Sequence, residues 1–94
     1  MVEIISEYIT FRNLPIQDTV EGTMNVVLES LAKEPENKIS GEFAEELVSS
    51  CAVVLNGLRR IKDPVRLFRN LGSAFERRGY CIYTKTVANA FKGI

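Results

Sequence analysis

Apolar residues recur at helical spacing through most of the stretch from residue 18 to residue 78, and this periodicity constrains the fold more than any other feature. Side chains three or four residues apart lie on one face of a helix, so each such series predicts an amphipathic helix that buries one stripe. Polar or Pro-containing connections separate three series, which predicts helices near 18–33, 40–60 and 64–78. A shorter helix is expected near 84–92. The sequence therefore predicts an all-α fold, a small bundle of four to five helices.

Each of the three longer helices is preceded by a residue that can cap its amino-terminal end. Asp18, with Glu21 three residues later, has the pattern of a capping box; Ser40 begins the next helix, and Asp63 precedes Pro64. Such a side-chain oxygen accepts a hydrogen bond from a first-turn N–H group, and Pro is favoured at the first helical position. We expect the core to include the large apolar residues of the later stripes, Phe43, Leu47, Leu55, Leu67, Phe68, Leu71 and Phe75.

Residues 2–12, VEIISEYITFR, fit two kinds of secondary structure. Their β-branched and aromatic residues favour a strand. The spacing of Ile4, Tyr8 and Phe11 favours a helix, and strict alternation is poor. We prefer the helix and leave the strand open.

The length of 94 residues predicts one domain, covering residues 1–94. Acidic residues follow Met1 closely, so no signal peptide is expected, and no apolar run is long enough to span a bilayer. Two cysteines, Cys51 and Cys81, form no disulfide framework and are expected to be reduced. These features indicate a cytoplasmic protein that does not enter the membrane.

The chain contains no His, which removes the usual general base and the commonest metal ligand. No arrangement of Ser or Cys with His is available for nucleophilic catalysis. We therefore expect no enzymatic activity, no catalytic residues, no metal site and no cofactor.

Positive and negative charges are segregated along the chain, although the net charge is zero. Residues 1–58 contain ten acidic and three basic residues, a net charge of −7. Residues 59–94 contain nine basic and two acidic residues, a net charge of +7. Segregation of this size indicates a basic face that binds a polyanion, or head-to-tail association of two copies.

The basic region has the pattern of a helix-turn-helix. Arginines are expected on the helix near 64–78, on the face opposite its apolar residues, and Gly79 is a suitable residue for the turn. In such proteins the first helix contacts phosphates and the second enters the major groove, where Asn can contact adenine. The predicted nucleic-acid-binding residues are Arg66, Arg69, Arg77, Arg78, Lys85, Asn89 and Lys92.

Residues 78–92 also resemble the recognition region of the arginine-repressor family of winged helices. Gly79-Tyr80, Ile82, Thr86-Val87 and Phe91 match the spacing of that family's motif. Ala-Asn follows Val87, where the family has Ser-Arg, and no β-hairpin wing follows before the last residue. The resemblance implies helix-turn-helix geometry and DNA binding.

Two functions follow from these observations and remain open. The first is a small DNA-binding protein of transcription regulation, acting as a homodimer. The second is a helical protein–protein interaction module, such as an adaptor, a viral accessory protein or an inhibitor, whose basic face binds an acidic protein surface.

Overall fold

Four helices make up most of the part of the chain that the computed structural model describes, namely residues 2–34, 39–58 and 60–78. The side chains of Val2, Asn56 and residues 75–78 are not described. The helices are α1 (Val2–Arg12), α2 (Val20–Lys33), α3 (Gly41–Leu58) and α4 (Pro64–Arg78). The all-α fold is confirmed, and residues 2–12 form a helix rather than a strand. The helix expected near 84–92 lies outside the described residues.

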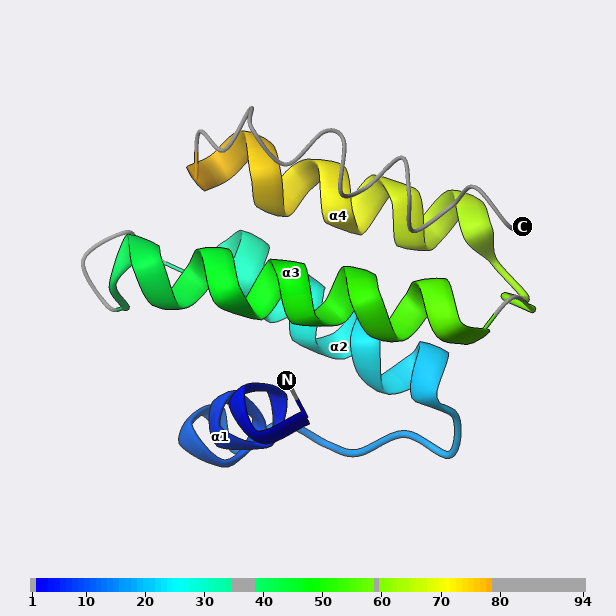
Figure 1. The fold of residues 1–94 in the computed structure, drawn as a ribbon, viewed down its shortest axis with the longest axis horizontal. Coiled ribbons are helices and arrows are strands. Elements are labelled where there is room, and N and C mark those ends of the chain that lie inside the picture. Colours follow the sequence, from blue (N-terminus) through cyan, green and yellow to red (C-terminus); the bar gives the residue numbers. More distant parts are fainter. Residues whose placement is uncertain (1, 35–38, 59, 79–94) are drawn as a thin grey trace.

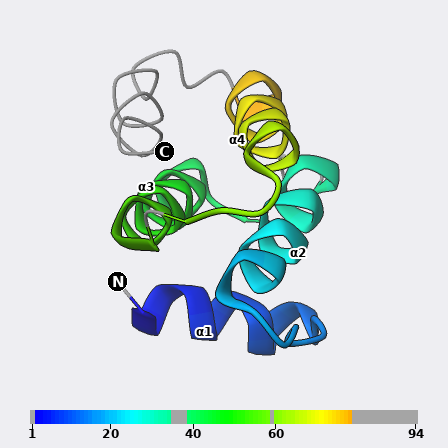
Figure 2. The same ribbon diagram turned by 90° about the vertical axis from the view of Figure 1, so that its right-hand side faces the viewer.

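Helices α2 and α3 run side by side in opposite directions, and α1 and α4 lie on opposite sides of this pair (Figures 1 and 2). α4 packs chiefly on α2, whereas α1 packs chiefly on α3. The two outer helices therefore have different neighbours and do not form one continuous surface.

All four helices contribute to one apolar core. α1 contributes Ile5 and the fully buried ring of Tyr8, whose hydroxyl shares a hydrogen bond of 3.0 Å with the hydroxyl of Ser30 on α2. Burial of a tyrosine ring normally requires such a partner for its hydroxyl. The other helices bury aliphatic stripes that include Val27, Leu28, Leu31, Leu47, Val48, Cys51, Leu55, Leu67, Leu71 and Ala74.

The start of α2 differs by one residue from the prediction. Thr19, not Asp18, is the N-cap residue, and its hydroxyl oxygen accepts a 3.0 Å hydrogen bond from the N–H group of Gly22. A side chain at position 22 would be crowded, because an added Cβ would lie 2.8 Å from the Cβ of Gln17. Gly22 therefore allows the preceding loop to fold back over the first turn of the helix.

The predicted caps of α3 and α4 are confirmed. The Ser40 hydroxyl accepts a hydrogen bond of 3.1 Å from the N–H group of Phe43. The Asp63 carboxylate accepts one of the same length from the N–H group of Arg66. α3 ends at Leu58, two residues earlier than expected.

A pair of backbone hydrogen bonds ends α1. The N–H group of Asn13 donates to the carbonyl of Thr10, and that of Leu14 donates to the carbonyl of Ile9, over 3.2 and 3.0 Å. This is the Schellman arrangement, which requires a left-handed residue after the helix. Asn13 has φ of 52° and fills that position, for which Asn is well suited.

The predicted core is right for the leucines and wrong for one aromatic residue. Leu47, Leu55, Leu67 and Leu71 are fully buried. Phe68 is 56% exposed, so its placement in the core was an error. Of the other two predicted aromatic core residues, Phe43 is half-buried and the side chain of Phe75 lies outside the described residues.

Candidate binding surface on helix α4

Helix α4 carries the only part of the predicted basic site that the described residues include. Arg66 and Arg69 are exposed on this helix. Arg77 and Arg78 belong to its last turn, but their side chains are not described. The remaining predicted residues, Lys85, Asn89 and Lys92, lie outside the described residues.

Arg66 is not a free cation, because it forms an ion pair with Glu29 of α2. One terminal nitrogen of its guanidinium donates to the Glu29 carboxylate over 2.8 Å. This hydrogen bond, followed by the negative charge of Glu29, raises the pKa of Arg66 above its usual value. Both side chains remain solvent-accessible, so the pair contributes more to orientation than to stability.

Asn70, four residues after Arg66, points toward α2 rather than toward solvent. Its side-chain amide donates a hydrogen bond of 2.6 Å to the side-chain oxygen of Asn25. Asn25 is 7% exposed, so its oxygen would otherwise be buried without this donor. This hydrogen bond defines how α4 is rotated on α2, because other rotations would leave the buried amide oxygen of Asn25 unsatisfied.

Glu21 attaches the beginning of α4 to the beginning of α2. Its carboxylate accepts hydrogen bonds from the backbone N–H groups of Lys62 and Asp63, over 2.9 and 2.8 Å. The capping-box role predicted for Glu21 was therefore wrong: its carboxylate binds the loop before α4.

These contacts explain why the prediction for Phe68 failed. Arg66 and Asn70 are drawn toward α2, which turns the flank that bears Val65 and Phe68 away from the core. Val65 is 65% exposed. The residues Val65, Arg66, Phe68 and Arg69 together are named the α4 surface here; they combine apolar side chains with arginine. A shallow hollow of about 380 Å³ adjoins this surface and is lined by Glu29, Asp63, Val65, Arg66, Arg69 and Asn70.

One sequence signal pointed to this arrangement and was missed. Asn25 directly follows Met24, a member of the apolar stripe of α2, and lies close to Val27 and Leu28 in that stripe. A polar residue on the buried side of a helix requires a polar partner. Asn70, at the matching level of α4, is that partner.

Other candidate chemistry is limited in the described part of the chain. Cys51 is fully buried, and burial raises the pKa of its thiol to about 12, so it stays protonated at neutral pH. Among residues 2–34, 39–58 and 60–78, no group of three acidic or cysteine side chains is placed to hold a metal ion. Cys81 lies outside these ranges.

Comparison of the chain with protein-family models, curated proteins and solved structures gave no match. A search of the described helices found none that is both long enough and apolar enough to cross a membrane.

Proposed function

We propose that this chain is a helical interaction module that binds an acidic surface of a partner protein through the α4 surface. The observation that supports this proposal is the mixture of exposed side chains on one helix: Val65 and Phe68 lie beside Arg66 and Arg69. Aromatic residues and arginine are enriched at protein interfaces, and arginine often contributes strongly to binding. Contacts with phosphates alone would not explain why the apolar side chains of Val65 and Phe68 are exposed beside the arginines.

The proposal assigns a binding role and no catalytic step to the chain. The expected place of action is the cytoplasm, because Cys51 is a free thiol and reducing compartments keep thiols unpaired. An acidic partner is chosen because Arg69 adds positive charge next to the apolar pair.

Affinity capture with the purified chain tests this function. Partners bound by the wild-type chain should be lost with the variant Val65→Ser/Arg69→Glu and retained with Ile16→Ser. Ile16 is 76% exposed and does not line the hollow beside the α4 surface, so it controls for loss of an exposed apolar side chain. Each captured protein is then purified and titrated by calorimetry. The proposal fails if no partner binds, or if both variants bind equally well.

A second candidate function is DNA binding by a homodimer, supported by the net charge of +7 in residues 59–94. Affinity for duplex DNA should then fall with salt with a log–log slope of about −0.9 per phosphate neutralised. Arg69→Ala should flatten this slope by about one unit. Asn89→Ala should instead weaken binding to the preferred DNA site by roughly 1–3 kcal/mol and should change binding to random DNA little.

Titration against duplex and single-stranded DNA at several salt concentrations separates the two functions. Substitution of Glu42, Glu45 and Glu46 by Gln should leave DNA binding unchanged, because these acids belong to the oppositely charged part of the chain. Sedimentation of the protein alone measures whether it is a dimer. A flat titration at low salt rejects the DNA-binding function.

A further inference from the structure

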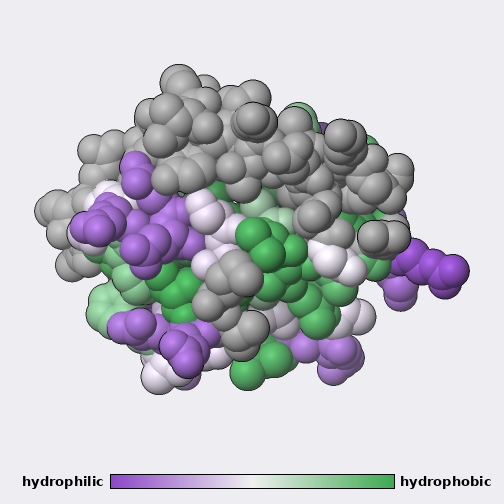
Figure 3. All heavy atoms as spheres, in the orientation of Figure 1, coloured by the Kyte–Doolittle hydropathy of each residue, from purple (hydrophilic) through white to green (hydrophobic). Residues whose placement is uncertain are grey.

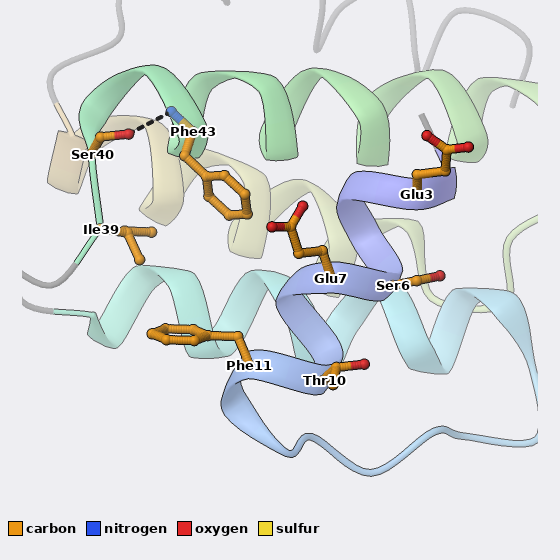
Figure 4. A pocket seen from close by; sticks show the side chains of 8 residues that line it. All are labelled: Glu3, Ser6, Glu7, Thr10, Phe11, Ile39, Ser40 and Phe43. Carbon is orange, nitrogen blue, oxygen red and sulfur yellow. Dashed lines mark hydrogen bonds between the residues drawn. The ribbon is translucent and has the colours of Figure 1, made fainter.

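A hollow of about 840 Å³ lies between α1 and the beginning of α3, on the side of the bundle away from α4 (Figure 4). Phe11 projects from α1, Ile39 precedes α3 and Phe43 lies in the first turn of α3; the three side chains surround the hollow in Figure 4. Phe11 is 62% exposed, whereas Ile39 and Phe43 are half-buried. The hollow therefore presents apolar surface to solvent.

The apolar walls of this hollow are held in place by specific contacts. The ring of Phe43 packs against that of the buried Tyr8, with 6.3 Å between ring centroids. The Arg12 guanidinium lies 4.7 Å from the centroid of the Phe11 ring and pairs with Glu34 at the end of α2. A preformed site loses less conformational freedom on binding than a flexible one.

The polar part of the hollow is acidic. Glu3 and Glu7, one turn apart on α1, line it, and Figure 4 shows the Glu7 carboxylate directed toward α3. A second hollow of about 730 Å³ shares both glutamates and Phe43, and adds further carboxylates from α3, those of Glu42, Glu45 and Glu46. Figure 3 shows apolar surface exposed on the face that α1 and α3 share, with hydrophilic groups beside it.

We infer that these two hollows form one groove that binds an amphipathic helix of a partner protein, with an apolar ridge flanked by Lys or Arg. Helices that dock in grooves insert residues spaced at i, i+4 and i+7, and the apolar walls formed by Phe11, Ile39 and Phe43 suit such a ridge. The five carboxylates select a cationic flank and oppose an acidic one. They also oppose nucleic acid and anionic lipid surfaces. The groove differs from the α4 surface in both position and charge, so the inference does not depend on the function proposed above.

A synthetic peptide provides the direct test. The probe is a fluorescein-labelled helical peptide with Leu at i, i+4, i+7 and i+11 and Lys at the flanking positions, and fluorescence anisotropy measures its dissociation constant. One control peptide replaces each Lys by Glu, and another has the same composition in shuffled order. The protein should bind the first peptide and should bind each control at least about tenfold more weakly.

Variants of the protein locate the binding. Phe11→Ser should weaken peptide binding by about tenfold or more, because it removes an apolar wall of the groove. The matched control Ile16→Ser removes an exposed apolar residue outside the groove and should have no effect. Glu3→Gln/Glu7→Gln should weaken binding and reduce its dependence on salt, whereas Asp18→Asn should change neither. Circular dichroism confirms that each variant remains helical.

The inference is overturned if the basic peptide does not bind, if the acidic or shuffled peptide binds as well, or if Phe11→Ser and Ile16→Ser behave alike. It is also overturned if the protein dimerises and Phe11→Ser breaks the dimer, because the groove is then occupied by a second copy. Val65→Ser/Arg69→Glu should leave peptide binding unchanged, so failure of this inference is distinguished from failure of the α4 proposal.

Discussion

The two outer helices are attached to the bundle in different ways. α4 is joined to α2 by polar contacts at several points, including the Asn25–Asn70 and Glu29–Arg66 hydrogen bonds. α1 packs mainly on α3 through apolar side chains, and its polar contacts with α2 include those of Tyr8 with Ser30 and of Arg12 with Glu34.

This difference explains where each helix leaves surface available. Polar contacts have strict geometry and therefore specify the rotation of α4, including the outward position of Val65 and Phe68. Apolar packing specifies the position of α1 less strictly, and a groove remains between it and α3. The polar contacts between α4 and α2 thus leave Val65 and Phe68 exposed on α4. The apolar packing of α1 on α3 leaves a groove between those two helices.

The largest effect is expected from removing a buried residue of α4. Leu71→Ala should lower the free energy of unfolding by about 2–5 kcal/mol, because Leu71 is fully buried and its loss leaves a cavity. Phe68→Ala should cause a clearly smaller loss, since Phe68 is more than half exposed. Urea denaturation followed by circular dichroism measures both. Equal losses would contradict the rotation of α4 described here.

The second effect concerns the hydrogen-bonded amides of Asn25 and Asn70. Asn70→Ala should destabilise the protein by about 1–3 kcal/mol, because the oxygen of Asn25 would lose its donor inside the bundle. The double variant Asn25→Leu/Asn70→Leu should recover part of this loss, since no polar group then remains unsatisfied. Denaturation of both variants measures the coupling. If the double variant is no more stable than Asn70→Ala, the pair does not determine the packing of the two helices.

A smaller effect is expected where α1 meets α2. Tyr8→Phe keeps the buried ring and removes its hydrogen bond to Ser30, which should cost about 0.5–1.5 kcal/mol. Tyr8→Phe/Ser30→Ala provides the control, because it removes both hydroxyls together. If Tyr8→Phe lowers the free energy of unfolding more than Asn70→Ala does, polar contacts matter more for α1 than for α4, which would contradict the comparison.

The ion pair on the α4 surface should contribute least to stability. Arg66→Ala should lower the melting temperature only slightly, because Arg66 and Glu29 are both solvent-accessible. The difference from wild type should shrink further as salt is added. Arg69→Ala is the matched control on the same helix. A large decrease in melting temperature that does not depend on salt would show that the Arg66 side chain stabilises the protein by packing.

A titration of stability against pH should show no pH dependence from Cys51 below about pH 9, the ordinary pKa of a thiol. Burial raises the pKa of the folded thiol to about 12, so the folded state holds its proton more tightly than the unfolded state. Stability from this group is therefore complete below pH 9 and is lost as the pH rises toward 12. Cys51→Ala should remove this component, and an unchanged alkaline slope would refute it.

Much of the fold was predictable from the sequence because local signals agreed with one another. The apolar series that includes Leu67 and Leu71 indicated a buried stripe, and Ser40 and Asp63 indicated helix starts. Residues 2–12 were ambiguous because β propensity and helical spacing conflicted, and packing on α3 resolved the conflict.

The candidate surfaces were less predictable, because both depend on contacts between segments far apart in the chain. The outward position of Phe68 follows from the Asn25–Asn70 contact, which spans 45 residues. The groove depends on how α1 crosses α3, and no local pattern at Phe11 or Phe43 encodes that crossing. The charge segregation was evident from the sequence, but the ion pair that engages Arg66 was not.

The buried thiol of Cys51 can be used to measure how often the helical bundle opens. In a Cys81→Ser background it is the single thiol, and it is enclosed in the core with a protonated sulfur. A thiol-specific reagent can then react only when the bundle opens, so the labelling rate measures the population of open molecules under native conditions. A ligand that binds the closed bundle should slow labelling in proportion to its occupancy, which would allow partners of either surface to be found without knowing their identity.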